Sequence, residues 1–256
     1  MIFLSILHQE SDRFKSILNR WRSDLPAEMA PHRRAVRALL HEMLTKELQL
    51  PADGYRLATD ANGRPVLEGG TGISLPAISL SHSGGWIACA AETEARTGQG
   101  IGLDLERAKT GRDHLALAEA AFGPTEITAV QAGGSAAFYR IWTLREAWSK
   151  ATGTGFAALT DRLDHVPTPL LEDTASRTST AAGWHWWSAR LRPDLQMALV
   201  SLETMTPETS RTANRSTPEI WKCHVSSELD LDGVIFHKSN ETSDVHGKPG
   251  RDDAAT

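Results

Sequence analysis

Two apolar runs separated by a pair of glycines place the strongest constraint on how this chain folds. Residues 78–83 read ISLSHS and residues 86–91 read WIACAA, with Gly84-Gly85 between them. Short runs rich in β-branched, aromatic and small apolar residues favour strands, and glycines interrupt such runs at turns. We therefore predict two strands joined at the glycine pair.

Helical patterns lie on both sides of this strand pair. Apolar side chains recur at helical spacing over residues 31–48, and Pro31 suits the first turn of that helix. The best-marked helix is predicted over about 135–152, because Gly153 and Gly155 end it. The remaining expected elements are helices at about 113–121 and from 124 onward, strands at 2–7, 100–106, 184–191 and 196–202, and hairpin turns at Asp53-Gly54 and Asn62-Gly63.

The predicted elements fall into two similar halves. Each half offers a helix, a glycine-marked turn and a strand pair that ends in an apolar run, WIACAA in the first and MALVSL in the second. This favours an α+β fold of two pseudo-duplicated halves related by a pseudo-twofold axis, with a site at their interface. Chance similarity within an α+β chain explains the same observation. We expect an N-terminal half over 1–103, a C-terminal half over 104–204 and a polar, largely disordered tail over 205–256.

Composition narrows the classes of protein to consider. The 256 residues are 40% hydrophobic and 23% charged, as in an ordinary globular protein, and the formal net charge of -5 gives no basic excess for nucleic acid. Two cysteines without CxxC spacing indicate neither a disulfide framework nor a zinc knuckle. The chain shows no membrane-length apolar stretch and no signal-peptide pattern at its start, so we predict a cytoplasmic protein with no membrane partner.

A pair of carboxylates follows strand spacing in the segment GIGLDLE. Asp104 and Glu106 stand two residues apart, so on a strand they share one face while Leu103 and Leu105 face a core. We expect the two carboxylates to face outward together and to suit Mg²⁺. Taken alone, a D-x-E pattern is explained better by an ordinary exposed strand face.

Three residues spaced four apart lie along one face of the best-marked helix. They are Trp142, Glu146 and Lys150. A surface ion pair is the ordinary interpretation of Glu146 and Lys150. The apolar surroundings argue instead for partial enclosure, where such a pair near other carboxylates can bind metal and move a proton.

Residues suited to phosphate lie earlier in the chain. Ser81 and His82 belong to a polar loop whose hydroxyls, imidazole and glycine backbone can cradle a phosphate. A Ser-His hydrolase is the poorer interpretation, because adjacent strand residues point to opposite faces and no G-x-S-x-G elbow is present. Further cations for a phosphorylated ligand, each of which an ordinary surface role explains as well, are Arg33, Arg34, Arg37 and Arg64.

Taken in order, these segments resemble the Sfp-type 4′-phosphopantetheinyl transferases. The family signature G-[IV]-D-[IV]-E is matched by GLDLE at 102–106, and W-x-x-K-E-[AS]-x-x-K by WTLREAWSK at 142–150. The G-[RK]-P turn and the S-H-S loop match residues 63–65 and 81–83. Arg145 stands where lysine is usual, which keeps the charge but changes its geometry.

The resemblance implies a magnesium-dependent transfer of 4′-phosphopantetheine from coenzyme A to a serine hydroxyl of an apo acyl or peptidyl carrier protein, with release of 3′,5′-adenosine diphosphate. Asp104, Glu106 and Glu146 would bind Mg²⁺, and Glu146 would act as the general base. Lys150 would assist at the pyrophosphate or protonate the departing phosphate.

The resemblance also implies residues that bind coenzyme A. His82 and Arg64 would contact its 3′-phosphate, with Ser81 in the same loop and Arg33 or Arg34 helping, and Lys150 would contact the pyrophosphate. The carrier surface would be an acidic helix, so a basic and apolar docking patch is expected beside the site.

Two other functions stay open on the sequence. A metal-dependent nuclease uses the same residue types, although such sites usually place the acid and lysine two apart on one strand and the chain is acidic. A catalytically silent protein that binds coenzyme A or a carrier would keep the same ligands. An internal site between two halves favours a monomer.

Overall fold

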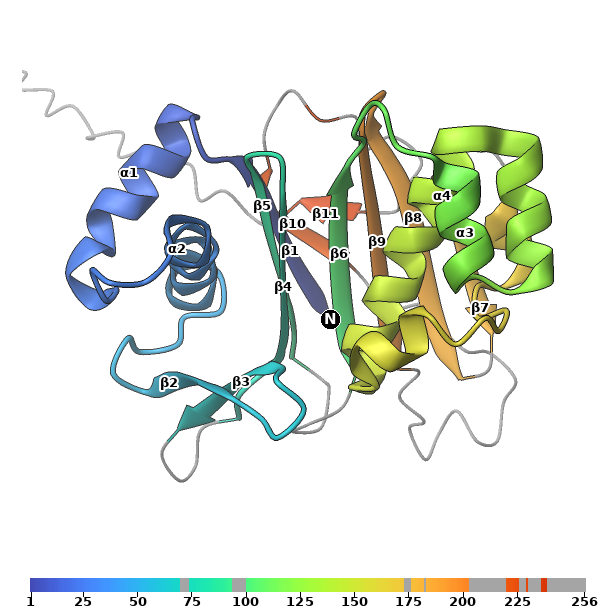
Figure 1. Cartoon of the computed structure of the whole chain (residues 1–256). Coiled ribbons are helices and arrows are strands. Elements are labelled where there is room, and N and C mark those ends of the chain that lie inside the picture. Colours follow the sequence, from blue (N-terminus) through green and yellow to red (C-terminus); the bar gives the residue numbers. More distant parts are fainter. Residues whose placement is uncertain are drawn as a thin grey trace, which may run out of the picture.

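The computed structural model describes residues 1–69, 74–93, 100–172, 176–181, 183–202, 220–225, 229 and 236–238 (Figure 1). Its helices are α1 (Asp12–Arg20), α2 (Pro31–Lys46), α3 (His114–Ala121) and α4 (Pro124–Thr152), with short 3₁₀ helices η1 (Arg22–Asp24), η2 (Gly155–Leu159) and η3 (Thr168–Leu171). Its strands are β1 (Ile2–His8), β2 (Tyr55–Thr59), β3 (Pro65–Gly69), β4 (Ala77–Ser83), β5 (Trp86–Glu92), β6 (Ile101–Arg107), β7 (Ser176–Ala181), β8 (Trp184–Arg192), β9 (Leu195–Leu202), β10 (Ile220–Val225) and β11 (Phe236–Lys238). Helices combined with largely antiparallel sheets confirm the α+β class.

Two sheets form the middle of the molecule, and helices cover them on the outside. The first sheet has the strand order β11-β10-β1-β5-β4, and the second has the order β6-β9-β8-β7. The helices α1 and α2 lie outside the first sheet, and α3 and α4 lie outside the second (Figure 1). The hairpin β2–β3 forms a separate two-stranded sheet beside β4. The layers therefore run helix, sheet, sheet, helix.

Side chains from both sheets share one core between them. Ala88 of β5 belongs to the same buried cluster as Leu103 and Leu105 of β6. The alternate β5 residues Ile87 and Cys89 pack instead with α2. Because both faces of β5 are buried, the run WIACAA is apolar throughout, and Cys89 within it is a buried free cysteine.

The crossing of α4 over β6 positions the residues of interest. Gly102 of β6 touches the helix so closely that a Cβ atom there would lie 1.7 Å from the carbonyl oxygen of Ala147, so only glycine fits. The two helical segments predicted from 124 and over 135–152 meet within α4 at Gly134, whose φ of 59° and ψ of -142° are not helical. Gly153 ends α4 in the left-handed region, as predicted.

Several elements differ from the sequence-based expectation. Residues 12–20 form α1, which was not predicted, and the Asp53-Gly54 turn precedes β2 instead of joining two strands, whereas Asn62-Gly63 does join β2 to β3. Two strands also lie in the segment expected to be a solvated tail. Residues 220–225 form β10, which pairs in parallel with β1 and then with β11, so that expectation is wrong for these residues. Most of 205–256 lies outside the described residues.

Membrane insertion through a helix has no support in the part of the chain that the structure describes. None of the helices there combines the length and the apolar character that crossing a bilayer requires.

Candidate active site

The strands β4 and β6 meet where the edges of the two sheets come together. They belong to different sheets, but β4 serine hydroxyls bridge the gap by accepting hydrogen bonds from the β6 backbone. These serines are Ser79, Ser81 and Ser83. The loop predicted to carry Ser81 and His82 is therefore the end of a strand that runs alongside the predicted carboxylate strand.

Asp104 is buried at this joint. Its side chain is only 3% exposed, and its Oδ1 accepts hydrogen bonds from Ser81 Oγ at 3.0 Å and from Lys150 Nζ at 2.6 Å. Lys150 Nζ also donates to the carbonyl oxygen of Leu103 at 3.0 Å. The expectation that Asp104 faces outward is wrong, because α4 crosses β6 here and covers it. The fold thus joins two motifs that lie 46 residues apart.

Glu146 lies on the same face of α4 as Lys150. Its Oε2 is 3.8 Å from Lys150 Nζ, and its side chain is 24% exposed. Burial, followed by repulsion from Asp104, raises the pKa of Glu146 to about 7, although Lys150 and a hydrogen bond with Trp142 oppose this. A carboxylate with a pKa near neutrality can both accept and return a proton at physiological pH.

Glu106 completes the group. Burial and then Asp104 raise its pKa, while a hydrogen bond from Ser83 Oγ to Glu106 Oε2 at 2.8 Å lowers it. Burial alone would lower the pKa of Lys150, but Asp104 and the two glutamates outweigh it and raise that pKa. We call these four residues, Asp104, Glu106, Glu146 and Lys150, the acidic centre.

The acidic centre suits a hard divalent cation in its donor chemistry. Among the described residues, no hydrogen-bond partner reaches the buried Oδ2 of Asp104, which is costly unless a cation or donor reaches it. Three carboxylates gather around a single lysine, and carboxylate oxygens are the ligands that Mg²⁺ prefers. Within the described residues no three His, Cys, Asp or Glu side chains stand as a ready-made metal cage. Lys150 Nζ instead contacts Asp104 and Glu146 and supplies the positive charge among the carboxylates.

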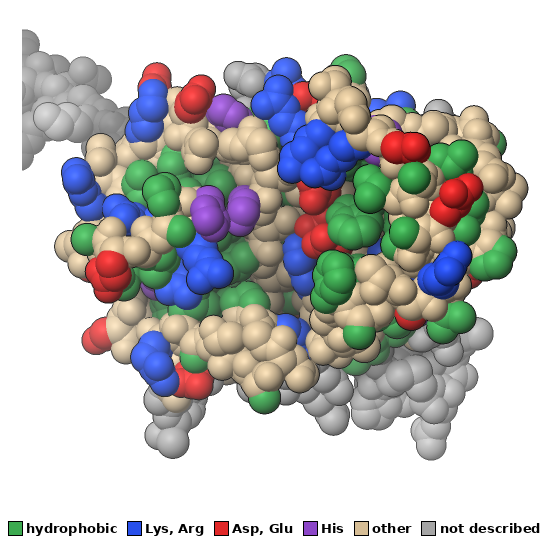
Figure 2. All heavy atoms as spheres, in the orientation of Figure 1, with side chains coloured by type: hydrophobic (Ala, Val, Ile, Leu, Met, Phe, Trp, Pro, Cys, Tyr) green, Lys and Arg blue, Asp and Glu red, His purple; other side chains and the backbone are tan. Residues whose placement is uncertain are grey.

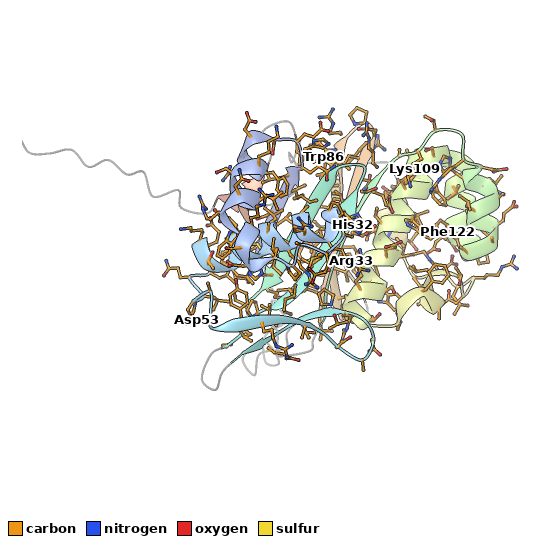
Figure 3. The ribbon with its side chains drawn as sticks, turned by 60° about the vertical axis from the view of Figure 1, so that its left-hand side comes forward. His32, Arg33, Asp53, Trp86, Lys109 and Phe122 are labelled. Carbon is orange, nitrogen blue, oxygen red and sulfur yellow. The ribbon has the colours of Figure 1, made fainter. Side chains whose placement is uncertain are left out.

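Two histidines and an arginine form a basic surface opposite the acidic centre. The rings of His32 and His82 lie with centroids 4.4 Å apart, and Arg33 is near enough to lower the pKa of His82 after burial, His32 and Lys150. Figure 3 shows His32 and Arg33 together at the start of α2, and Figure 2 shows histidine and basic side chains across a hollow from acidic ones. A helix start favours anions because its N–H groups are free.

Arg33 and Arg34 were predicted from the sequence to bind phosphate, whereas His32 was not. The signal was available, because His32 occupies the first turn of the predicted helix beside Arg33. Arg34 differs from Arg33 in its contacts: its guanidinium binds the carbonyl oxygens of Ala27 and Met29 in the preceding loop. That guanidinium therefore fastens the loop to α2.

Arg64 fastens the β2–β3 turn to the end of α4. It binds Asp60 through Nε at 2.7 Å and reaches the carbonyl oxygen of Ala151 at 3.4 Å. Beside it lies a cavity of about 470 Å³, which we call the Arg64 pocket. Its lining includes Lys150, Pro65 and Leu75 and is mostly apolar. The Arg64 pocket thus reaches the acidic centre from one side.

A second cavity reaches the acidic centre from the other side. This cavity of about 320 Å³, the Trp142 pocket, is lined by Glu106, Trp142 and Tyr139 together with basic and apolar side chains of the second half. Among these, Phe156 is 70% exposed and Lys109 lies on the half opposite to His32 (Figure 3). The acidic centre therefore stands between two cavities of different character.

Arg145, the residue that departs from the family signature, faces away from the site. Its side chain is fully buried and pairs with Glu126 at 2.8 Å and with Asp161 at 3.1 Å. It also donates to the carbonyl oxygens of Ala121 and Leu163 and to those of two further residues in the segment after α4. Arg145 therefore holds the loop after α4 in place and does not line either pocket.

Comparison with known proteins places a family match on the segment that contains this site. Residues 100–200 match the model of the 4'-phosphopantetheinyl transferase superfamily, a segment that includes Asp104, Glu146 and Lys150. This segment of the chain is thus similar to that superfamily.

Several curated proteins are 27–29% identical to this chain in sequence over 53–60% of its length. The 4'-phosphopantetheinyl transferase HetI of Nostoc sp. is 29% identical over 160 residues, which is 60% of this chain and 64% of the relative. The 4'-phosphopantetheinyl transferase psf-1 of Bacillus pumilus is 28% identical over 57% of this chain and 56% of the relative. The L-aminoadipate-semialdehyde dehydrogenase-phosphopantetheinyl transferase of Xenopus laevis is 27% identical over 53% of this chain and 48% of the relative. The chain thus spans between about half and two thirds of the length of these relatives.

Proposed function

We propose that this protein transfers the 4′-phosphopantetheine moiety of coenzyme A to a serine hydroxyl of an apo acyl or peptidyl carrier protein and releases 3′,5′-adenosine diphosphate. One observation carries the proposal. Asp104 of β6 and Lys150 of α4 meet at 2.6 Å between two cavities, with Glu146 beside them and an oxygen of Asp104 left without a partner.

The basic surface and the Arg64 pocket suit coenzyme A. His32, His82 and Arg33 offer cationic and N–H donors for its 3′-phosphate at a helix start. The Arg64 pocket offers apolar walls for the adenine ring and Arg64 at its rim. Lys150 then lies where the pyrophosphate passes from this pocket to the acidic centre.

Asp104, Glu106 and Glu146 would hold Mg²⁺ at the pyrophosphate. The ion would neutralise charge on the phosphate oxygens and so favour attack by a neutral hydroxyl. Glu146 would remove the proton from the carrier serine, directly or through water, because its raised pKa leaves it a competent base near neutral pH.

The bond changes balance with these roles. The serine oxygen forms a bond to the phosphorus that carries pantetheine, and the bond from that phosphorus to the bridging oxygen breaks. The oxygen leaves with 3′,5′-adenosine diphosphate, where the Lys150 ammonium offsets its negative charge. The serine proton moves to Glu146.

The Trp142 pocket suits the acceptor. It opens beside Glu106 and combines Lys109 and Arg112 with apolar side chains, including the exposed Leu117 and Phe156. A carrier that presents its serine beside an acidic helix would complement such a surface in charge and in apolar character.

We also propose that the two halves are related by duplication, with the division between residues 103 and 104 as predicted above. In support, α2 packs on the strands of the first sheet as α4 packs on those of the second (Figure 1). The monomeric state and the cytoplasmic location remain predictions.

Intact mass of the carrier tests the proposed function. The purified protein is incubated with coenzyme A, Mg²⁺ and a panel of apo acyl and peptidyl carrier domains. Addition of one phosphopantetheine mass to at least one carrier is expected. If coenzyme A binds but no carrier in the panel is modified, the protein is a silent binder. If the protein were a nuclease, DNA would raise its melting temperature and coenzyme A with Mg²⁺ would not. The acid and lysine of such a site would here come from a strand and a helix, Asp104 of β6 and Lys150 of α4.

A further inference from the structure

Three serines of β4 connect the two sheets through side-chain hydrogen bonds to β6. Alternate residues of a strand share one face, so Ser79, Ser81 and Ser83 all point toward β6. Their hydroxyl oxygens accept hydrogen bonds from the β6 backbone N–H groups of Leu103 at 2.9 Å, of Leu105 at 3.1 Å and of Arg107 at 3.0 Å. Side chains of the first sheet thus complete the backbone hydrogen bonding of the second sheet's edge strand.

Two of the three serines also donate a hydrogen bond to a carboxylate. Ser81 Oγ donates to Asp104 Oδ1 at 3.0 Å, and Ser83 Oγ donates to Glu106 Oε2 at 2.8 Å. A serine hydroxyl carries a single proton and two acceptor lone pairs. The backbone N–H fixes where each oxygen lies, and the one proton is then directed to a carboxylate. The hydroxyl of Ser79 has a backbone contact of the same kind, and no carboxylate lies among its hydrogen-bond contacts in the described residues.

Burial makes these contacts restrictive. Ser81 is 6% exposed and Ser83 is 8% exposed, so water does not readily replace either hydroxyl. With Oδ1 of Asp104 held by Ser81 and Lys150, its other oxygen is left unpartnered. The hydroxyls therefore determine which carboxylate oxygens remain available.

We propose that Ser81 and Ser83 are positioning residues that orient Asp104 and Glu106 as ligands of a divalent cation, so that the N-terminal sheet sets the geometry of a metal site on the C-terminal sheet. The inference rests on the proposed function, since that function supplies the cation. It also gives Ser81 a different role from the predicted contact with coenzyme A, because its hydroxyl is directed at β6.

Mn²⁺ binding tests this inference without turnover. Each variant is saturated with coenzyme A, and free Mn²⁺ is followed by electron paramagnetic resonance during a titration. Ser83→Ala and Ser81→Ala are expected to bind Mn²⁺ about 10-fold more weakly, as is typical when a residue that orients a metal ligand is removed. Ser79→Ala is the matched control, because it removes the same backbone bond and no carboxylate bond. Its melting temperature should fall like that of the other two, with Mn²⁺ affinity within about twofold of wild type.

Two outcomes overturn the inference. Equal Mn²⁺ affinity in all three alanine variants and the wild type would show that the serines only join the sheets. An equal loss of Mn²⁺ affinity in Ser79→Ala would show that removing any of the three serine contacts between the sheets disturbs the site. Failure of the proposed function looks different, because the wild type would then modify no carrier while its Mn²⁺ affinity could still be compared with that of Ser83→Ala.

Discussion

Two charged clusters lie on different faces of α4, and each includes one of two adjacent residues, Arg145 and Glu146. Arg145 belongs to a cluster with Glu126 and Asp161, which we call the arginine cluster, whereas Glu146 belongs to the acidic centre. Both are largely withdrawn from water. They differ in how completely their polar atoms are partnered.

The arginine cluster is nearly closed. Glu126 accepts four hydrogen bonds, from Arg145 and from backbone N–H groups at Gly123, His165 and Val166. Arg145 in turn donates through both terminal nitrogens, and within the described part of the chain only its Nε lacks a partner. A buried pair satisfied in this way has little capacity to take a ligand.

The acidic centre is open by the same measure. One lysine faces three carboxylates, one Asp104 oxygen has no partner, and the pKa of Glu146 is raised to about 7. Burial of charge alone therefore does not distinguish a functional site. The mark is burial with incomplete partnering next to a cavity.

The largest expected effect is on stability and concerns the closed cluster. Arg145→Ala leaves Glu126 buried without its cation, and removal of one partner from a buried ion pair costs about 3–5 kcal/mol. Urea unfolding should show this loss. Arg145→Lys should lose less, since the charge stays while most of the carbonyl contacts go. A stability close to wild type in Arg145→Ala would mean that the cluster is not closed in the sense described.

In the acidic centre, a large loss of activity with little loss of stability is expected. Glu146→Gln keeps the shape of the side chain but removes the base, so transfer to a carrier should fall about 10²–10⁴-fold with little loss of stability. Time courses by intact mass give the rate, and Glu10→Gln at an exposed position is the matched control. Rates within a few fold of wild type would remove Glu146 from the chemistry.

Transfer and stability should depend on pH in different ways through Glu146. Glu146 must be deprotonated to act as the base, so transfer should fall as the pH is lowered. The free energy of unfolding that depends on Glu146 should instead rise as the pH is lowered. A carboxyl whose folded pKa is raised stabilises the fold at low pH, and this contribution is lost as pH rises from about 4.5 through 7. Unfolding measured at pH 5 and pH 8 should therefore show a smaller difference in Glu146→Gln than in wild type, and an equal difference would contradict the assignment.

The smallest effect concerns the basic surface. Arg33→Ala should raise the KM for coenzyme A about tenfold, because one charge-assisted hydrogen bond to the 3′-phosphate is lost. With 3′-dephospho-coenzyme A as substrate, wild type and Arg33→Ala should not differ. Arg34→Ala is the comparison, since its guanidinium binds the loop at 27–29. A larger effect in Arg34→Ala would reverse the assignment.

Local patterns predicted most of the elements and the composition of the site. Glycines ended the strands and α4 where expected, and helical spacing placed Trp142, Glu146 and Lys150 on one face. Long-range contacts were not predictable in this way. The burial of Asp104 depends on α4 crossing at Gly102, and β10 joins β1 from more than 200 residues away, as the pairing of Ile2 with Ile220 shows.

The roles of single residues were harder to predict than their place in a motif. Arg145 and Glu146 are neighbours in one signature, yet they contact different partners on different faces of the helix. Ser81 was expected to contact coenzyme A, and the structure shows a second contact for it, a hydrogen bond from its hydroxyl to Asp104. In both cases the partner comes from another element, so no pattern within the motif reveals it.

Carrier modification by the wild type and by Glu146→Gln, with Mg²⁺ or with a chelator, is the most direct test that the open cluster is the active site. The predicted result is one phosphopantetheine mass on an apo carrier with the wild type and Mg²⁺, and almost none with the chelator or with Glu146→Gln. Equal modification by both proteins, or equal modification with and without the metal ion, would contradict the account.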